Sequence, residues 1–274
     1  MKFVNPIGVF DSGMGGLTIL KEIQKALPDY DYLYLGDNAR VPYGNRSFEA
    51  VRKYTWQCVK FLLDQGCPLV IIACNTASAK ALRTIQQIDL PRDYPGRKVL
   101  GIIRPTTEIA GQLTESNHLG ILATQGTVTS ESYVIEINKF FPHVSVFQQA
   151  CPMWVPLIEN NEHNDIGADY FVSKYLKRIL DYSSRIDTLI LACTHYPLLL
   201  DKIKKILPST VSVIAQGPIV ASSLQDYLQR HSEVEKLLTK GNRRQFLTTD
   251  DTESFNQKAQ VFLAESIISK HITI

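Results

Sequence analysis

The fold is decided by the segment Leu69-Val-Ile-Ile-Ala-Cys-Asn-Thr-Ala77, whose pattern returns in Leu189-Ile-Leu-Ala-Cys-Thr-His195. Each segment is a short apolar run that ends in Ala-Cys and continues into small polar residues. Such a run, bounded by turn-forming residues, is typical of a buried strand in a parallel sheet. The cysteine then stands at the carboxyl end of the strand, where open α/β sheets bind ligands. We therefore expect one site that is flanked by two thiols.

The arrangement around each cysteine also repeats along the chain. A predicted strand ends at Asp11, and Cys74 follows 63 residues later. A second predicted strand ends just before Thr124, and Cys193 follows 69 residues later. A nearly constant separation favours two related α/β domains, each with a parallel sheet joined by right-handed crossovers.

The polar segment 90–97 contains two prolines and a glycine and is typical of a linker. After it, the alternation of strand and helix starts again, with an expected strand at 99–103 and an expected helix at 105–114. Near the carboxyl end we expect a helix at 252–263 and a short strand at 271–274.

Composition indicates an ordinary soluble globular protein. Of the 274 residues, 45% are hydrophobic and 20% are charged, which is enough to build a sizeable core. The net charge of +2 gives no electrostatic reason to expect nucleic acid or a membrane as partner. Because no apolar stretch is as long as a membrane span and residues 1–6 lack a secretory signal, we expect a cytoplasmic protein.

The cysteines do not form a disulfide framework, because five is an odd number and their spacing is irregular. We expect free thiols, with Cys58 and Cys67 in structural roles. The turn at 12–16 has neither the spacing of a dinucleotide-binding motif nor that of a P-loop. Cys193 and His195 could ligate a metal, but no CxxC or HExxH motif accompanies them. We therefore expect neither a cofactor nor a metal.

The two strand-end thiols allow several interpretations. Each could be a buried small hydrophobe, and Cys193 with His195 could act as a lone nucleophile, which leaves Cys74 without a role. Inversion of a stereocentre uses both thiols, because one face needs a base and the other an acid. Asp11 and Glu159 could adjust the pKa values of the two thiols. Asp11 could instead cap the next helix. The sequence alone favours a solvated helix end for Glu159.

Five segments, taken in order, resemble the glutamate racemases. They are Ile7-Gly-Val-Phe-Asp-Ser-Gly-Met-Gly-Gly-Leu17, Gly36-Asp-Asn-Ala-Arg-Val-Pro-Tyr-Gly44, Ala73-Cys-Asn-Thr-Ala77, Pro156-Leu-Ile-Glu159 and Leu191-Ala-Cys-Thr-His-Tyr-Pro-Leu198. The resemblance implies cofactor-independent interconversion of L- and D-glutamate, which supplies D-glutamate for peptidoglycan. It also implies two open parallel-sheet α/β domains with the active site in the cleft between them. The first would comprise residues 1–98 and 216–274, and the second residues 99–215.

The resemblance further implies roles for individual residues. Cys74 would deprotonate D-glutamate with the help of Asp11, and Cys193 would deprotonate L-glutamate with the help of His195 and Glu159. The residues implied in substrate binding are Asp11, Ser12, Pro42, Tyr43, Gly44, Asn75, Thr76, Thr127, Thr194 and His195. Ala215-Gln-Gly-Pro218 and Arg104 depart from the family pattern, so domain-interface contacts do not carry over.

Other functions stay open at this point. An aspartate racemase or another two-cysteine isomerase of the same fold is the nearest alternative, and the loop at 36–44 favours glutamate. A binding module of the same fold would have no need for both cysteines. The expected partner is the small-molecule substrate, and the sequence is compatible with a homodimer.

Overall fold

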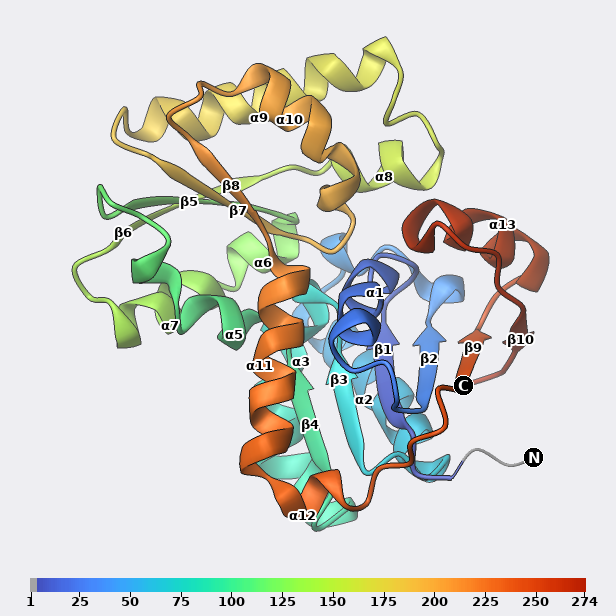
Figure 1. The fold of residues 1–274 in the computed structure, drawn as a ribbon. Helices are drawn as coiled ribbons and strands as arrows, with labels where there is room; N and C mark the ends of the chain where they lie inside the picture. Colours follow the sequence, from blue (N-terminus) through green and yellow to red (C-terminus); the bar gives the residue numbers. More distant parts are fainter. Residues whose placement is uncertain (1–3) are drawn as a thin grey trace. The chain divides into compact units, whose positions relative to one another are not determined.

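In the computed structural model, which describes residues 4–274, the two Ala-Cys segments end strands of two different sheets (Figure 1). The chain divides into two compact units. One contains the residues up to Ile102 together with Gly217–Ile274, and the other contains Ile103–Gln216.

The sheet of the first unit has six strands, and all neighbouring strands are parallel. Its order is β10 (Ser269–His271), β9 (Arg244–Thr248), β2 (Tyr32–Gly36), β1 (Ile7–Asp11), β3 (Leu69–Ile72) and β4 (Lys98–Gly101). Every residue of the three central strands is buried, as their continuous apolar sequences predict. The C-terminal segment supplies β9 and β10 and thus returns to the first sheet.

Helices cover both faces of this sheet. α1 (Leu17–Ala26), α11 (Gln216–Arg230) and α13 (Thr252–Leu263) lie on one face (Figure 1). α2 (Phe48–Asp64) and α3 (Asn75–Thr84) pack on the other face, around a core that includes Phe10, Cys58 and Cys67. The shorter elements are η1 (Asn38–Arg40), η2 (Tyr43–Asn45), a π-helical turn (Ile85–Asp89), α4 (Leu90–Asp93) and α12 (Ser232–Glu235).

The sheet of the second unit has four parallel strands. Its order is β6 (Ser145–Ala150), β5 (His118–Ala123), β7 (Thr188–Ala192) and β8 (Ser212–Ala215). One face is covered by α9 (Ile166–Tyr182) and α10 (Leu200–Ile206), and the other by α5 (Ile103–Thr107) and α7 (Ser132–Phe140) (Figure 1). The remaining elements are η4 (Ala110–Gln112), α6 (Gln125–Thr129), α8 (Trp154–Glu159) and η5 (Tyr196–Leu199).

The two sheets repeat one topology. The order β2-β1-β3-β4 of the first unit matches the order β6-β5-β7-β8 of the second, with the Ala-Cys strand third in both. The predicted fold class, two similar parallel-sheet α/β units, is therefore confirmed. Among residues 4–274, no helix combines the length and the apolar character that crossing a membrane requires.

Four details of the sequence-based prediction are wrong. The strand expected to open the second domain is β4, which pairs with β3 in the first sheet, and the expected linker is α4 and a turn within the first unit. An apolar strand fits the edge of either sheet, so its sequence does not predict which of the two sheets it joins. The helix expected at 105–114 is divided into α5 and η4, because Ile109 (φ −118°) leaves the helical region. The terminal strand lies at Ser269–His271 instead of 271–274.

Candidate active site

In the first unit, Asp11 and Cys74 lie at the carboxyl ends of two neighbouring strands. Their strands, β1 and β3, are parallel neighbours with Phe10 opposite Ile72. The pairing continues past the strand end, because the Ala73 amide donates a hydrogen bond to the Phe10 carbonyl at 2.7 Å. The carboxylate and the thiol therefore share the carboxyl edge of the sheet, as predicted.

Cys74 is the N-cap residue of α3. Its Sγ accepts a hydrogen bond from the Ala77 amide at 3.4 Å and lies 3.3 Å from the Ser12 hydroxyl oxygen. The side chain is buried with 6% of its surface exposed. Donors at a helix N-terminus, together with the helix dipole, stabilise negative charge on sulfur. The position suits a thiol that must carry and release a proton.

Asp11 is fully buried at the end of β1. One carboxylate oxygen accepts a hydrogen bond from the Gly13 amide at 2.8 Å. The N-cap of α1 is Gly16, which makes no side-chain cap, so the interpretation of Asp11 as a helix cap is wrong. A Cβ at Gly16 would lie 2.6 Å from the Asp11 Cβ, so this packing depends on a glycine.

Tyr34, which the sequence did not single out, lies beside this group. Its hydroxyl donates to the Gly13 carbonyl at 2.9 Å. Burial raises the pKa of Tyr34 well above its usual value, and the nearby Asp11 and Cys74 raise it further. Tyr34 therefore stays a neutral hydrogen-bond donor that fixes the turn after Asp11.

The other candidates of the first unit surround this edge. Asn75 and Thr76 form the buried first turn of α3, and the amino end of a helix favours a bound anion. Pro42, after a cis peptide bond, is exposed, whereas Tyr43 is buried and its hydroxyl donates to the Asp37 carboxylate. Because its hydroxyl is hydrogen-bonded to Asp37, we expect Tyr43 to contact a substrate through its main chain. We expect the same of Gly44, which has no side chain.

In the second unit, the register places three strand ends level with one another. Ala123 pairs with Ala150 on one side and with Ala192 on the other. Thr124, Cys151 and Cys193 therefore follow at the same carboxyl edge. Thr124 accepts a hydrogen bond from the amide of the buried Thr127 at 3.3 Å, which fixes the start of α6 next to Cys193.

His195 connects Cys193 to Glu159. Its Nε2 lies 3.0 Å from the Glu159 Oε1, and its Nδ1 lies 4.0 Å from the Cys193 Sγ. Burial alone would lower the pKa of His195, but the interactions with Cys193 and Glu159 outweigh it and raise the pKa to about 10. The imidazole is therefore protonated at neutral pH. The expectation of a solvated helix end for Glu159 is wrong, because its carboxylate pairs with a buried histidine.

Cys151 is a third strand-end cysteine, for which the sequence predicted no role in the site. It is buried, and its carbonyl accepts a hydrogen bond from the Tyr196 hydroxyl at 3.1 Å. Burial raises the pKa of the Cys151 thiol well above its usual value, and the neighbouring Cys193 adds to the effect. Ala150-Cys151 repeats the Ala-Cys strand ending, so this signal was present in the sequence.

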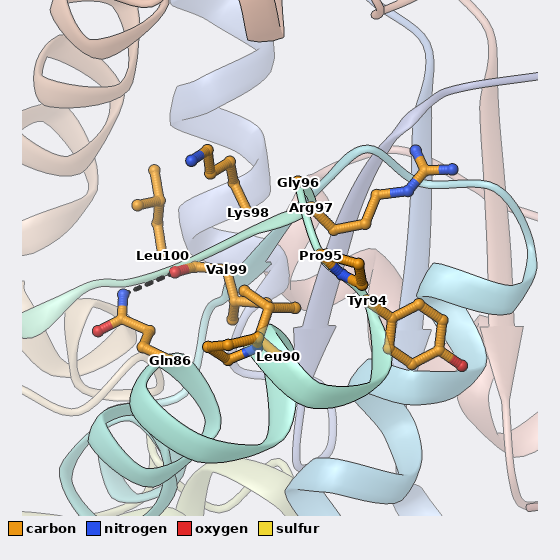
Figure 2. Close-up of a pocket in the computed structure, with 10 residues that line it drawn as sticks. Gln86, Leu90, Tyr94, Pro95, Gly96, Arg97, Lys98, Val99 and Leu100 are labelled. Atoms are coloured by element: carbon orange, nitrogen blue, oxygen red, sulfur yellow. Dashed lines mark hydrogen bonds between the residues drawn. The ribbon is translucent and has the colours of Figure 1, made fainter.

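A cavity of about 440 Å³ lies elsewhere in the first unit, at the amino end of β4. Figure 2 shows Gln86 donating to the Val99 carbonyl there, with the side chains of Arg97 and Lys98 pointing away from Leu90. None of its lining residues belongs to the candidate site. Within residues 4–274, no group of three or more His, Cys, Asp or Glu side chains is arranged to hold a metal ion.

The known proteins that this chain resembles are racemases of amino acids and related compounds. Residues 7–224 match the Asp/Glu/hydantoin racemase family. A glutamate racemase from Levilactobacillus brevis is 38% identical over 98% of this chain and 95% of its own length. The crystal structure of a glutamate racemase isoform from Bacillus anthracis has a TM-score of 0.89 at 33% identity, covering 100% of this chain and 99% of that one. The glutamate racemase from Francisella tularensis, solved with D-glutamate, has a TM-score of 0.87 at 34% identity over 98% and 97% of the two chains.

Proposed function

The chain belongs to the Asp/Glu/hydantoin racemase family, and on that premise we propose that it is a cytoplasmic glutamate racemase that supplies D-glutamate for peptidoglycan. The observation that carries this proposal is the pair of strand-end cysteines. Each stands at the carboxyl edge of its own parallel sheet, beside a buried titratable partner: Asp11 for Cys74 and His195 for Cys193.

The proposed reaction uses both thiols on one substrate. From L-glutamate, the Cys193 thiolate removes the α-proton, and the Cys74 thiol delivers a different proton to the opposite face of the α-carbon. From D-glutamate, the two residues exchange roles. The protonated His195, held by Glu159, stabilises negative charge on the Cys193 sulfur, and the cap position does the same for Cys74. Asp11 assists Cys74.

Substrate binding relies on uncharged donors. The first two amides of α3 and the hydroxyls of Thr76, Thr127 and Thr194 can bind carboxylate oxygens without a dedicated arginine. Donors directed at the α-carboxylate also stabilise the charge that develops when the α-proton leaves.

A circular-dichroism assay tests the proposal. The purified chain should convert either enantiomer of glutamate to the racemic mixture without added cofactor, and should convert aspartate much more slowly. Cys74→Ala and Cys193→Ala serve as inactive controls for contaminating racemase. Faster racemisation of aspartate would favour the aspartate racemase alternative, and no racemisation of either amino acid would refute the proposal.

A further inference from the structure

The carboxylate of Asp37 is the centre of a buried hydrogen-bond network directly after β2. Asp37 is fully buried, and its two oxygens accept hydrogen bonds from Arg40 Nε at 2.6 Å, Thr249 Oγ1 at 2.9 Å and the Tyr43 hydroxyl. Its own amide donates to the Asp11 carbonyl at 3.1 Å. Asp37 therefore attaches the loop that follows it to the strand end that carries Asp11.

Arg40 compensates the charge of Asp37 and ties the loop to α2. Its Nη1 donates to Gln57 at 2.6 Å, its Nη2 lies 3.3 Å from the Cys58 Sγ, and its guanidinium carbon lies 4.5 Å from the centre of the Tyr54 ring. The Arg40 side chain thus contacts three residues of α2 while it pairs with Asp37. These charge-assisted hydrogen bonds connect the loop both to the end of β2 and to α2.

The far end of the loop is attached to the helix that Cys74 caps. Lys80 lies on α3 with 8% of its surface exposed, and its Nζ donates to the Arg46 carbonyl at 2.8 Å. The segment between Asp37 and Arg46 is therefore fixed at one end to the Asp11 strand and at the other to the Cys74 helix. Pro42, Tyr43 and Gly44 lie between these two anchors.

From this geometry we infer that Asp37 is a positioning residue: through Tyr43 and Arg40 it holds the segment Pro42–Gly44 in its substrate-binding conformation. The inference rests on the proposed function, because only that function assigns this segment to substrate. A network that holds a binding loop sets the fraction of molecules whose loop is in the binding-competent conformation. If the competent fraction falls to a tenth, the apparent affinity falls tenfold while the chemistry of the bound complex is unchanged.

The chain contains a matched control at the other end of the same strand. Asp31 precedes β2 as Asp37 follows it, and both are fully buried. The Asp31 carboxylate accepts hydrogen bonds from the Arg243 side chain and backbone amide, at 3.2 and 3.0 Å. The two aspartates thus have similar burial and a similar arginine partner, but only Asp37 lies at the edge that carries Asp11 and Cys74.

The test compares Asp37→Asn with Asp31→Asn in steady-state racemisation of glutamate, after folding of both has been checked by circular dichroism. Asp37→Asn should raise KM about tenfold or more and change kcat less than threefold. Asp31→Asn should lose stability but keep the native KM. Equal KM values in the two variants, or a loss confined to kcat in Asp37→Asn, would overturn the inference.

A milder pair keeps the test decisive if Asp37→Asn does not fold. Tyr43→Phe and Thr249→Val each remove one hydroxyl donor to Asp37, and each should raise KM with little change in kcat. The double variant should have a KM close to that of the worse single variant, because both act through one carboxylate. Native KM in both folded single variants would overturn the inference. Absence of racemisation by the unaltered chain would instead refute the proposed function itself.

Discussion

Replacing Glu159 by Gln should make stability less dependent on pH, through His195. Glutamine keeps the size of the side chain and an oxygen that can face Nε2, but it removes the negative charge 3.0 Å from that nitrogen. A histidine pKa raised from 6.5 to about 10 corresponds to at most about 5 kcal/mol of unfolding free energy. The charged hydrogen bond to Glu159 supplies roughly 1.5–3 kcal/mol of that amount.

The sign of the effect follows from the direction of the shift. Because the folded state holds the proton more tightly, this stabilisation is complete below pH 6.5 and is lost as pH rises toward 10. The difference in unfolding free energy between the native chain and Glu159→Gln should therefore be largest near pH 6 and should disappear near pH 10. Groups that do not interact with His195 titrate alike in both chains, so their contributions cancel in the difference.

Urea unfolding at several pH values between 6 and 10 measures this difference. Glu233→Gln is the matched control, since Glu233 pairs with His231 at 3.1 Å on the exposed surface. That substitution should change stability little at any pH, because solvent screens an exposed pair. A Glu159→Gln difference that stays constant across the range would refute the assignment of a protonated His195.

Three further predictions concern the substrate groups, the packing of Asp11 and metal. Thr76→Val and Thr194→Val should each raise KM roughly 5- to 150-fold, since an unpaired carboxylate oxygen costs about 1–3 kcal/mol; native kinetics in both variants would remove these residues from the site. Gly16→Ala should lower kcat/KM more than tenfold by displacing Asp11, whereas Gly167→Ala, where a Cβ meets nothing within 4 Å, should leave activity unchanged. Dialysis against a chelator should not change the rate, and a loss that metal restores would favour the metal interpretation of Cys193 and His195.

The sequence predicted the strand ends well because they are local features. An apolar run that stops at Ala-Cys defines both a strand and its end within a few residues. Since the carboxyl ends of parallel neighbours share one edge, the sequence alone predicts that Asp11 and Cys74 lie close together. The shared strand order of the two units explains why the spacing of 63 and 69 residues was informative.

The features that the sequence did not predict depend on contacts between distant segments. Glu159 and His195 are 36 residues apart, and Thr249 reaches Asp37 across 212 residues. No local periodicity specifies such pairs, since they arise only when separate elements pack. The placement of β4 is of the same kind, because its apolar pattern suits the edge of either sheet.

Deuterium incorporation tests the central claim, that each thiol serves one face of the α-carbon. Racemisation is started in deuterated water from each enantiomer, and the α-position of substrate and product is followed by NMR at early times. The two-base mechanism predicts that the product is fully deuterated while the remaining substrate stays almost unlabelled, because the group that removes the proton does not deliver the new one. Product that retains the original α-proton, or substantial racemisation by folded Cys74→Ala or Cys193→Ala, would contradict it.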